Sequence, residues 1–470
     1  MIQQLATPLP EGFCREMHAL PGIDSDALLA SLQTPPSVSI RLNPGKPALD
    51  PPFAECEAVG WCADGRYLSD RPVFAAMPEW HAGAFYVQDA SSMIHCHIGR
   101  HIAEIAGKSR LRVLDLCAAP GGKTTALAAA LPSGSLIVAN ECVPRRARIL
   151  TENTIKWGGG NILAASASST AWSKAAEAFD IVAVDAPCSG EGMMRKEDVA
   201  RSQWSPALVA QCASLQQEIL RDAMCTLRPG GFLIYSTCTF NRRENELNAE
   251  WLAQEFGLEP VAIHLPDSCS ASKGIATDIP CLRFMPHLTR GEGLFVTVMR
   301  KPGEFTQPRT PKSGKPGKGR PHAAQTEAEA WLDPARGLEA TTEGNRIYAR
   351  QKEHASFIAT LQRIVPALPP GFALAEMKGK SVIPAHAAIM SGCLRADAFP
   401  KVQLSQSEAC SYLRREPVAL PADTPSGYVI ASYNGVELGL LKNLGNRANN
   451  LYPNEWRMLL NPKNIDTENE

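Results

Sequence analysis

The chain has 470 residues, of which 44% are hydrophobic and 6% aromatic, a length that allows about two to four domains. Its formal net charge of −1 excludes a global basic surface, so a nucleic-acid site would have to be a local patch. The fourteen cysteines include no CxxC pair, the N-terminal residues lack a secretory signal, and no apolar run reaches the roughly 20 residues of a membrane helix. We therefore expect a soluble cytoplasmic protein with free thiols.

Residues 1–100 are predicted to form an N-terminal α+β domain. The opening is helix-like, SVSIRLNP is typical of a strand, and AFYVQDASSM leads into the next domain. A zinc site is suggested by four residues near the end of this segment, namely His95, Cys96, His97 and His101. Their spacing matches no standard site and places them on a helix face, so we expect no metal.

Residues 101–301 alternate short β-rich runs with longer helix-like stretches. The runs are LRVLDL, GSLIVANE, FDIVAVD, GFLIYST and GLFVTVM. This alternation predicts an α/β domain around a mainly parallel sheet. Ligands of such sheets bind beyond the carboxyl ends of the strands, so the loops after these runs are the first places to look for a site.

The first of these runs leads into CAAPGGKTTALAAAL, a turn followed by an Ala-rich helix. Glycines in the turn let a ligand approach the backbone, and the helix start offers free N–H groups. A Walker A loop would need glycine at Cys117, and the GxGxxG fingerprint is absent, so a phosphate cradle is disfavoured. Glu141 ends the next strand, about 20 residues after Gly122, where a carboxylate can bind both hydroxyls of a ribose.

This pattern favours an adenosine ligand without required phosphates, and S-adenosylmethionine fits best. Taken singly, a capping glutamate and a helix-packing glycine turn are the simpler interpretations.

Two cysteines stand just beyond two further predicted strands. Cys188 follows Asp185 at the end of FDIVAVD, and Cys238 follows GFLIYST. A lone buried cysteine is most often a small hydrophobic residue. Two at one edge of a sheet, beside a cofactor loop, favour a thiolate nucleophile and a second thiol that acts after it. At the same edge, Asp185 can hold a base by hydrogen bonds.

The remaining residues predict a linker and a third domain. Residues 302–328 are rich in Pro, Gly and Lys, with five basic residues and no acidic one between positions 309 and 320, which is typical of a basic flexible linker. Residues 329–470 predict a small α+β domain. Four of its polar residues suit contacts with an RNA backbone: Lys442, Asn446, Arg447 and Asn450.

DLCAAPGGKT, DAPCSGEG and YSTCT, in this order and followed by NRRENE, resemble the motifs of RNA cytosine-C5 methyltransferases of the Sun and nucleolar-protein family. The ending LGLLKNLGNRANNLYP is similar to the C-terminal domain of its bacterial RsmF-type branch, which methylates 16S ribosomal RNA. The resemblance implies a Rossmann-like S-adenosylmethionine-dependent methyltransferase core, an N-terminal RNA-binding domain and a C-terminal PUA-like RNA-binding domain. It also implies ribosomal RNA or the small ribosomal subunit as the partner, and not DNA. We further expect a monomer and no membrane partner.

The family pattern implies a role for each matching residue. Cys238 is the nucleophile that attacks C6 of cytosine, and Cys188 helps to release the product. Asp185 contacts the cofactor, faces the base and donates a proton to N3. Cofactor contacts are implied for Cys117, Ala118, Ala119, Pro120, Gly121, Gly122, Lys123 and Glu141. Attack at C6 is needed because C5 is too weak a nucleophile to take a methyl group directly, and the base must be flipped out or unpaired.

The sequence departs from the family near the expected adenine site. Members usually place an aspartate after the third strand, whereas NILAASASST offers Ser166, Ser168 and Ser169. We expect either a weaker cofactor affinity or a neutral hydrogen bond from Ser168. Arg41 and Asn43 resemble the family's RNA-contacting strand, although no physical signal separates this role from a structural one.

Three alternatives stay open. The same chemistry can act on transfer RNA or another RNA. A DNA cytosine methyltransferase would place its nucleophile in a Pro-Cys loop, which makes Cys188 essential and leaves Cys238 without a role. A non-catalytic RNA-binding module would fail to bind S-adenosylmethionine.

Overall fold

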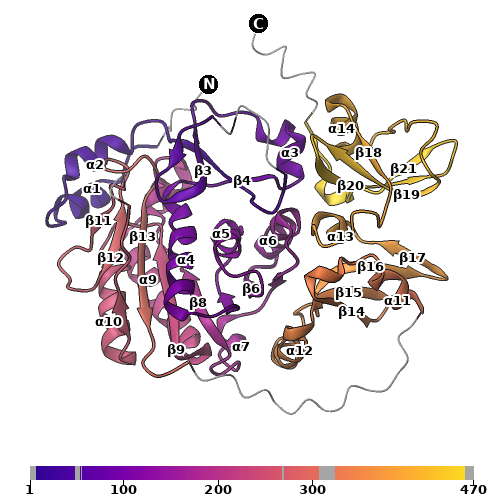
Figure 1. Cartoon of the computed structure of the whole chain (residues 1–470). Coiled ribbons are helices and arrows are strands. Elements are labelled where there is room, and N and C mark those ends of the chain that lie inside the picture. The colour runs from indigo at the N-terminus through magenta and orange to yellow at the C-terminus, as the bar shows by residue number, and fades with distance from the viewer. Residues whose placement is uncertain (1–6, 48–52, 54, 267–268, 306–322, 461–470) are drawn as a thin grey trace, which may run out of the picture.

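The computed structural model describes residues 7–47, 53, 55–266, 269–305 and 323–460 (Figure 1). A large central sheet with helices on both faces is flanked by an N-terminal sheet and two C-terminal sheets. None of the helices within these ranges is long and apolar enough to cross a membrane. Residues 306–322, most of the expected basic linker, lie outside the described ranges.

The central sheet has nine strands. They are β5 (Arg112–Asp115), β6 (Leu136–Asn140), β7 (Ile162–Ala165), β8 (Phe179–Asp185), β9 (Leu227–Thr237), β10 (Glu259–Val261), β11 (Ser272–Lys273), β12 (Cys281–Phe284) and β13 (Leu294–Arg300). The order is β11-β12-β13-β9-β8-β5-β6-β7, with β10 paired to β13. Neighbours from β9 to β7 are parallel, and β13 is antiparallel to β9. All five β-rich runs are strands of this sheet, which confirms the predicted Rossmann-like fold class.

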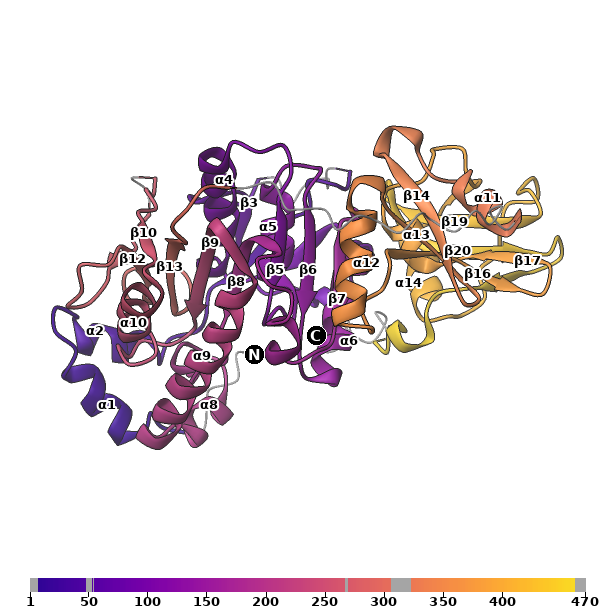
Figure 2. The ribbon, with the colours of Figure 1, turned by 90° about the horizontal axis from the view of Figure 1, so that it is seen from below.

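Helices cover both faces of the central sheet (Figure 2). They are α4 (Ile94–Ala106), α5 (Gly122–Ala130), α6 (Pro144–Trp157), α7 (Ser169–Trp172), α9 (Pro206–Thr226) and α10 (Glu246–Phe256). Helix α8 (Asp198–Gln203) packs instead with the N-terminal helices. Side chains of α4, α5 and α6 form the core on one face, and those of α7, α9 and α10 the core on the other. Because both faces are covered, the strands are continuously apolar instead of alternating.

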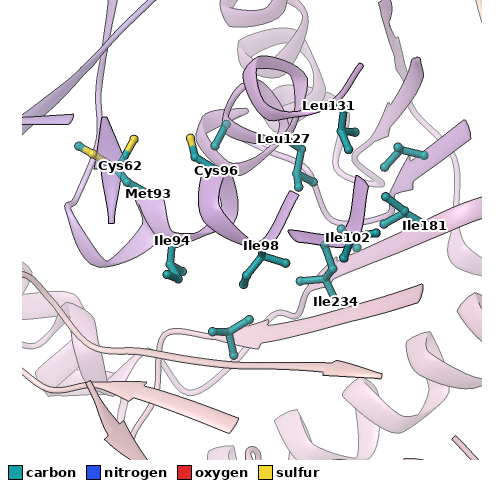
Figure 3. Packing of buried hydrophobic residues seen from close by; sticks show 14 of the residues in the cluster. Cys62, Met93, Ile94, Cys96, Ile98, Ile102, Leu127, Leu131, Ile181 and Ile234 are labelled. Atoms are coloured by element: carbon teal, nitrogen blue, oxygen red, sulfur yellow. The ribbon is translucent and has the colours of Figure 1, made fainter. Parts of the chain in front are cut away.

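One face of α4 enters the core (Figure 3). Its Ile98 and Ile102 belong to the same buried cluster as Ile181 and Ile234 of the sheet. Cys96, one of the residues that suggested zinc, is also fully buried in this cluster. The described part of the chain contains no group of three or more His, Cys, Asp or Glu residues arranged to hold a metal ion.

The N-terminal unit combines three helices with an antiparallel sheet. The helices are α1 (Glu11–His18), α2 (Ser25–Ser31) and α3 (Pro78–His81), and the strands are β1 (Val38–Leu42), β2 (Ala58–Val59), β3 (Cys62–Leu68) and β4 (Phe85–Val87), in the order β2-β3-β1-β4. The strand predicted from SVSIRLNP is β1. Asn43, directly after it, donates to the backbone oxygens of Gly83 and Trp157, both at 2.8 Å. The unit is therefore joined to the end of α6.

The C-terminal part contains two four-stranded sheets. The first comprises β14 (Leu338–Glu343), β15 (Arg346–Gln351), β16 (Phe372–Lys378) and β17 (Ser381–Pro384), with α11 (Ala323–Glu329) and α12 (Ala355–Ile364). The second comprises β18 (Lys401–Gln403), β19 (Gly427–Tyr433), β20 (Val436–Asn443) and β21 (Ala448–Asn450), with α13 (His386–Met390) and α14 (Gln406–Leu413). Within the linker expected over 302–328, residues 323–328 belong to α11, and Phe305 packs on Phe232.

The C-terminal sheets share cores with the rest of the chain. Val402 and Tyr412 of the second sheet unit lie in one buried cluster with Ile40 and Phe85 of the N-terminal sheet. Helix α12 joins the core of the central domain, where Phe357 meets Phe179 with ring centroids 5.6 Å apart. The C-terminal part is therefore packed against the central domain and the N-terminal unit together.

Candidate active site

Four loops that carry the candidate residues meet at the carboxyl edge of the parallel strands. They follow β5, β6, β8 and β9, and they hold residues 117–123, Glu141, Asp185 to Cys188, and Cys238. In the sheet β5 lies between β6 and β8, and β9 is the next strand beyond β8. The loop after β5 is therefore beside Glu141 on one side and Asp185 on the other, in the crevice where such sheets bind ligands.

The loop of residues 117–123 is tied to the elements around it. Gly121, directly before α5, has φ of +110°, a backbone conformation that favours glycine. Hydrogen bonds hold the loop: Ala118 N to Asn140 O at 2.8 Å, Arg146 Nη2 to Ala119 O at 3.0 Å, Asn153 Nδ2 to Pro120 O at 2.8 Å and Tyr86 Oη to Pro120 O at 3.0 Å. The shape of the loop thus depends on the N-terminal unit, which supplies Tyr86.

Glu141 lies directly after β6, as predicted, with its side chain buried. One carboxylate oxygen accepts a hydrogen bond from Val143 N at 2.9 Å, and the other lies 3.2 Å from Arg146 Nη1. A carboxylate oxygen accepts more than one hydrogen bond, so both can still bind ribose hydroxyls. An acid at this place, a glycine turn and a helix start with free N–H groups fit the adenosine part of S-adenosylmethionine.

Lys123 and Asp185 form an ion pair at the centre of the edge. Lys123 Nζ lies 2.6 Å from Asp185 Oδ1, and Ser236 Oγ donates to the same oxygen at 2.8 Å. Burial lowers the pKa of Lys123, but the charge of Asp185, the hydrogen bond to it and the two nearby cysteines together outweigh this effect, and the pKa is raised. Lys123, expected only as a cofactor contact, is therefore an ammonium group bound to the carboxylate that was expected to face the base.

Asp115 and Cys117 are two further ionisable groups of the edge, and Asp115 was not predicted. Its buried carboxylate accepts a hydrogen bond from Thr124 Oγ1 at 2.6 Å. Burial raises the pKa of Asp115 to about 7, and burial also raises the pKa of the Cys117 thiol. Cys117 therefore stays a thiol. An acid ending the apolar run LRVLDL was the available signal for Asp115.

The two cysteines lie together. Cys188 Sγ and Cys238 Sγ are 3.2 Å apart, although 50 residues separate them in the chain. The hydrogen bond with Cys238 and burial raise the pKa of Cys188 well above its usual value. Cys188 therefore keeps its proton, and either sulfur can donate in the contact between them. The structure brings together Asp185, Cys188, Cys238 and the loop after β5, as the sequence predicted.

Two buried glutamates beside the cysteines were missed. Glu191 follows Cys188 in DAPCSGEG, and Glu244 lies in NRRENE after Cys238; neither is exposed to solvent. Both accept hydrogen bonds from the loop of the other cysteine. Acidic residues inside two of the quoted motifs were the only signal, since loops carry no hydrophobic period that reports burial.

Ser168 lies after β7, exposed, and its hydroxyl caps α7 by accepting a hydrogen bond from Ala171 N at 3.2 Å. The next two hydroxyls, of Ser169 and Thr170, donate to Asp222 at 2.7 and 3.0 Å. The contact of Ser168 with an adenine stays a prediction.

Arg41 and Asn43 are not available to RNA. Arg41 is completely buried; it donates to Gln88 Oε1 at 2.8 Å and to Thr125 Oγ1 at 2.6 Å, and its guanidinium lies 4.3 Å from the Trp157 ring centroid. Both residues therefore join the N-terminal unit to α5 and α6. At the far end of the chain Asn446 and Arg447 are exposed, whereas Asn450 Nδ2 donates to Tyr412 O at 2.8 Å.

Three family models match the chain. Residues 104–300 match the model described as 16S rRNA methyltransferase RsmB/F, residues 9–90 the N-terminal domain of 16S rRNA methyltransferase RsmF, and residues 399–458 the methyltransferase RsmF PUA domain. The chain is 32% identical over 469 residues to the ribosomal RNA small subunit methyltransferase F of Enterobacter sp. (strain 638), covering 95% of each protein. It is 33% identical to the protein of the same name from Klebsiella pneumoniae (strain 342), covering 95% of this chain and 96% of that protein.

Solved structures share the fold of part of the chain. A methyltransferase homolog from Pyrococcus horikoshii is 25% identical with a TM-score of 0.51, and the match covers 62% of this chain and 94% of that one. NSun6 from the same organism is 19% identical with a TM-score of 0.51, covering 63% of this chain and 99% of that one.

Proposed function

Because the chain belongs to the RsmB/F family of 16S ribosomal RNA methyltransferases, we propose that it methylates C5 of a cytosine in 16S ribosomal RNA through a covalent bond between Cys238 and C6. Its cofactor is S-adenosylmethionine, which supplies an electrophilic methyl group when bound. The observation that carries the proposal is the pair of thiols 3.2 Å apart, next to the ion pair of Lys123 and Asp185.

The attack requires a thiolate and a proton source. Cys238 gives its proton to solvent, and its thiolate sulfur forms a bond to C6, which makes C5 electron-rich. The electrons displaced from the ring are stabilised when N3 gains a proton, which the ammonium of Lys123 supplies through Asp185. This arrangement modifies the expectation that Asp185 alone is the acid, because Asp185 is bound to a cation at 2.6 Å.

Release requires the C5 proton to leave and the bond between C6 and sulfur to break. Cys188 gives its proton to the departing Cys238 sulfur and takes the proton from C5, so that the electrons of the C5–H bond restore the double bond between C5 and C6. N3 returns its proton to Asp185. The raised pKa of Cys188 supports this role, since a protonated Cys188 does not compete with Cys238 for C6 during the attack. The same sulfur becomes a strong base once its proton has moved.

The order of the two cysteines is tested with single and double variants. RNA or small subunits from cells that lack the protein, together with S-adenosylmethionine, serve as substrate. Cys188→Ala should attack and methylate, then stall as a denaturant-resistant protein–RNA complex on a gel. Cys238→Ala and the double variant should form none. An adduct that survives loss of Cys238 and disappears with loss of Cys188 would instead support the Pro-Cys mechanism of DNA methyltransferases.

The target nucleotide is to be identified by bisulfite sequencing of ribosomal RNA. A cytosine that is protected in wild-type cells and converted in cells without the protein is the substrate. Protection that changes only in a transfer RNA would overturn the assignment to 16S ribosomal RNA while keeping the chemistry.

The domain roles follow from the same proposal. The central domain performs the transfer, whereas the N-terminal unit and the second C-terminal sheet unit position RNA by its backbone, with exposed Arg447 among the contacts. We propose that the protein acts as a monomer.

A further inference from the structure

Two buried carboxylates cross-link the loops that carry the cysteines. Glu191 lies three residues after Cys188 and Glu244 six residues after Cys238, and both side chains are completely buried. Each one contacts the loop to which it does not belong.

Glu191 holds the loop of Cys238. One of its oxygens accepts hydrogen bonds from the backbone nitrogens of Phe240 at 2.6 Å and Asn241 at 2.9 Å, just past the cysteine. Its other oxygen accepts from Trp204 Nε1 at 3.0 Å. The backbone on the C-terminal side of Cys238 is thus bound to the loop of Cys188.

Glu244 holds the loop of Cys188 in the reverse direction. It accepts hydrogen bonds from Ser189 N at 3.0 Å and Ser189 Oγ at 2.5 Å, on the residue next to Cys188, and from Gln216 Nε2 at 2.8 Å. The amide of Asn241 joins the two carboxylates by donating to Glu191 at 3.0 Å and to Glu244 at 2.7 Å.

The partners in these bonds are all donors, so the acceptor atoms of both carboxylates are satisfied, while burial raises the pKa of Glu244. Burying two charges without a bonded cation is unfavourable unless every acceptor is satisfied, and this is why a fully connected network specifies one geometry. Here the specified geometry is the approach of Cys188 to Cys238.

We propose that Glu191 and Glu244 are positioning residues with different duties: Glu191 places Cys238 for attack, and Glu244 places Cys188 for release. The inference rests on the proposed function, because it uses the division of labour between the cysteines. It goes beyond that function by predicting that loss of Glu244 slows release of the product, whereas loss of Glu191 slows formation of the covalent adduct.

The test replaces each carboxylate with the amide of equal size. A glutamine side chain has one oxygen and one NH₂ group, and the NH₂ group would face a donor in this network. Glu244→Gln should therefore weaken the hydrogen bonds to Ser189 and misplace Cys188. Since a misplacement of about 1 Å can slow a reacting pair by up to about 100-fold, release should slow by roughly 10 to 100-fold. The denaturant-resistant adduct should then accumulate as it does in Cys188→Ala.

Glu191→Gln should show the reverse phenotype. It should form the adduct more slowly, by roughly 10 to 100-fold, and it should do so even when combined with Cys188→Ala, where release is blocked. A role in stability alone would slow both steps together and would accumulate no adduct.

Asp180→Asn is the matched control. Asp180 is equally buried, at the opposite end of β8, where it accepts from Arg112 N at 2.8 Å and lies 3.1 Å from Lys108 Nζ. It should lower stability without accumulating adduct. Should Glu244→Gln fail to fold, Ser189→Ala removes one of the same bonds and should accumulate less adduct than Cys188→Ala but more than wild type.

The outcomes separate the two proposals. If Cys188→Ala itself accumulates no adduct, the division between the cysteines is wrong. If Cys188→Ala accumulates adduct while Glu244→Gln and Ser189→Ala behave like Asp180→Asn, the proposed function stands and the positioning role of Glu244 is overturned. Normal adduct formation in Glu191→Gln overturns the role of Glu191.

Discussion

Arg41→Met tests how the N-terminal unit supports the cofactor loop. The change removes hydrogen bonds from a charged donor to Gln88 and Thr125, which are worth about 1.5–3 kcal/mol each. It also removes a buried cation–π contact with Trp157 of about 2 kcal/mol. Part of this loss is recovered because a buried guanidinium no longer has to be desolvated, at several kcal/mol. We expect the free energy of unfolding to fall by about 3 kcal/mol.

The measurements are urea denaturation, calorimetric binding of S-adenosylmethionine, and RNA binding as a function of salt. Thr125 lies in the first turns of α5, so the variant should also bind the cofactor about tenfold more weakly, equal to about 1.4 kcal/mol. The salt dependence of RNA binding should keep its slope, since no phosphate contact is lost. As a control, Arg145→Met, which replaces an exposed arginine of α6, should change stability by less than about 0.5 kcal/mol. Wild-type stability with a shallower salt slope would show that Arg41 contacts RNA after all.

Three further predictions concern the cofactor, pH and the C-terminal part. Glu141→Gln should weaken S-adenosylmethionine binding by about 1.5–3 kcal/mol in calorimetry, and unchanged affinity would remove Glu141 from the site. Burial raises the pKa of Asp115 to about 7, so its contribution to stability is present below the unfolded pKa of about 4 and is lost as pH rises toward 7. Asp115→Asn should therefore flatten the plot of unfolding free energy against pH, and identical plots for the variant and the wild type would contradict this. Deleting residues 323–470 should weaken RNA binding and also lower the melting temperature, because the buried side chain of Ile40 would lose the apolar C-terminal residues that pack against it. An unchanged melting temperature would show that the C-terminal part is an independent domain.

The sequence by itself determined the fold class, the family and the edge of the sheet at which the site lies. Continuous apolar runs such as FDIVAVD are typical of strands covered on both faces, and parallel strands bring their carboxyl ends to one edge. For this reason Asp185, Cys188 and Cys238 could be placed together without coordinates. The positions of Glu141 and of the glycine turn follow from the same rule.

The tertiary structure alone decided which polar groups meet and which apolar faces are shared. Arg41 stands in a strand pattern that suits an exposed residue, yet the packing of β1 against α5 buries it. Glu191 reaches Asn241 across 50 residues of chain, and Lys123 at the start of α5 reaches Asp185 at the end of β8. The sequence shows that the apolar residues around Val402 must be buried, but only the tertiary structure shows that they are buried against the N-terminal sheet. Local periodicity reports that a residue is buried or exposed on average, whereas its partner depends on how distant segments pack.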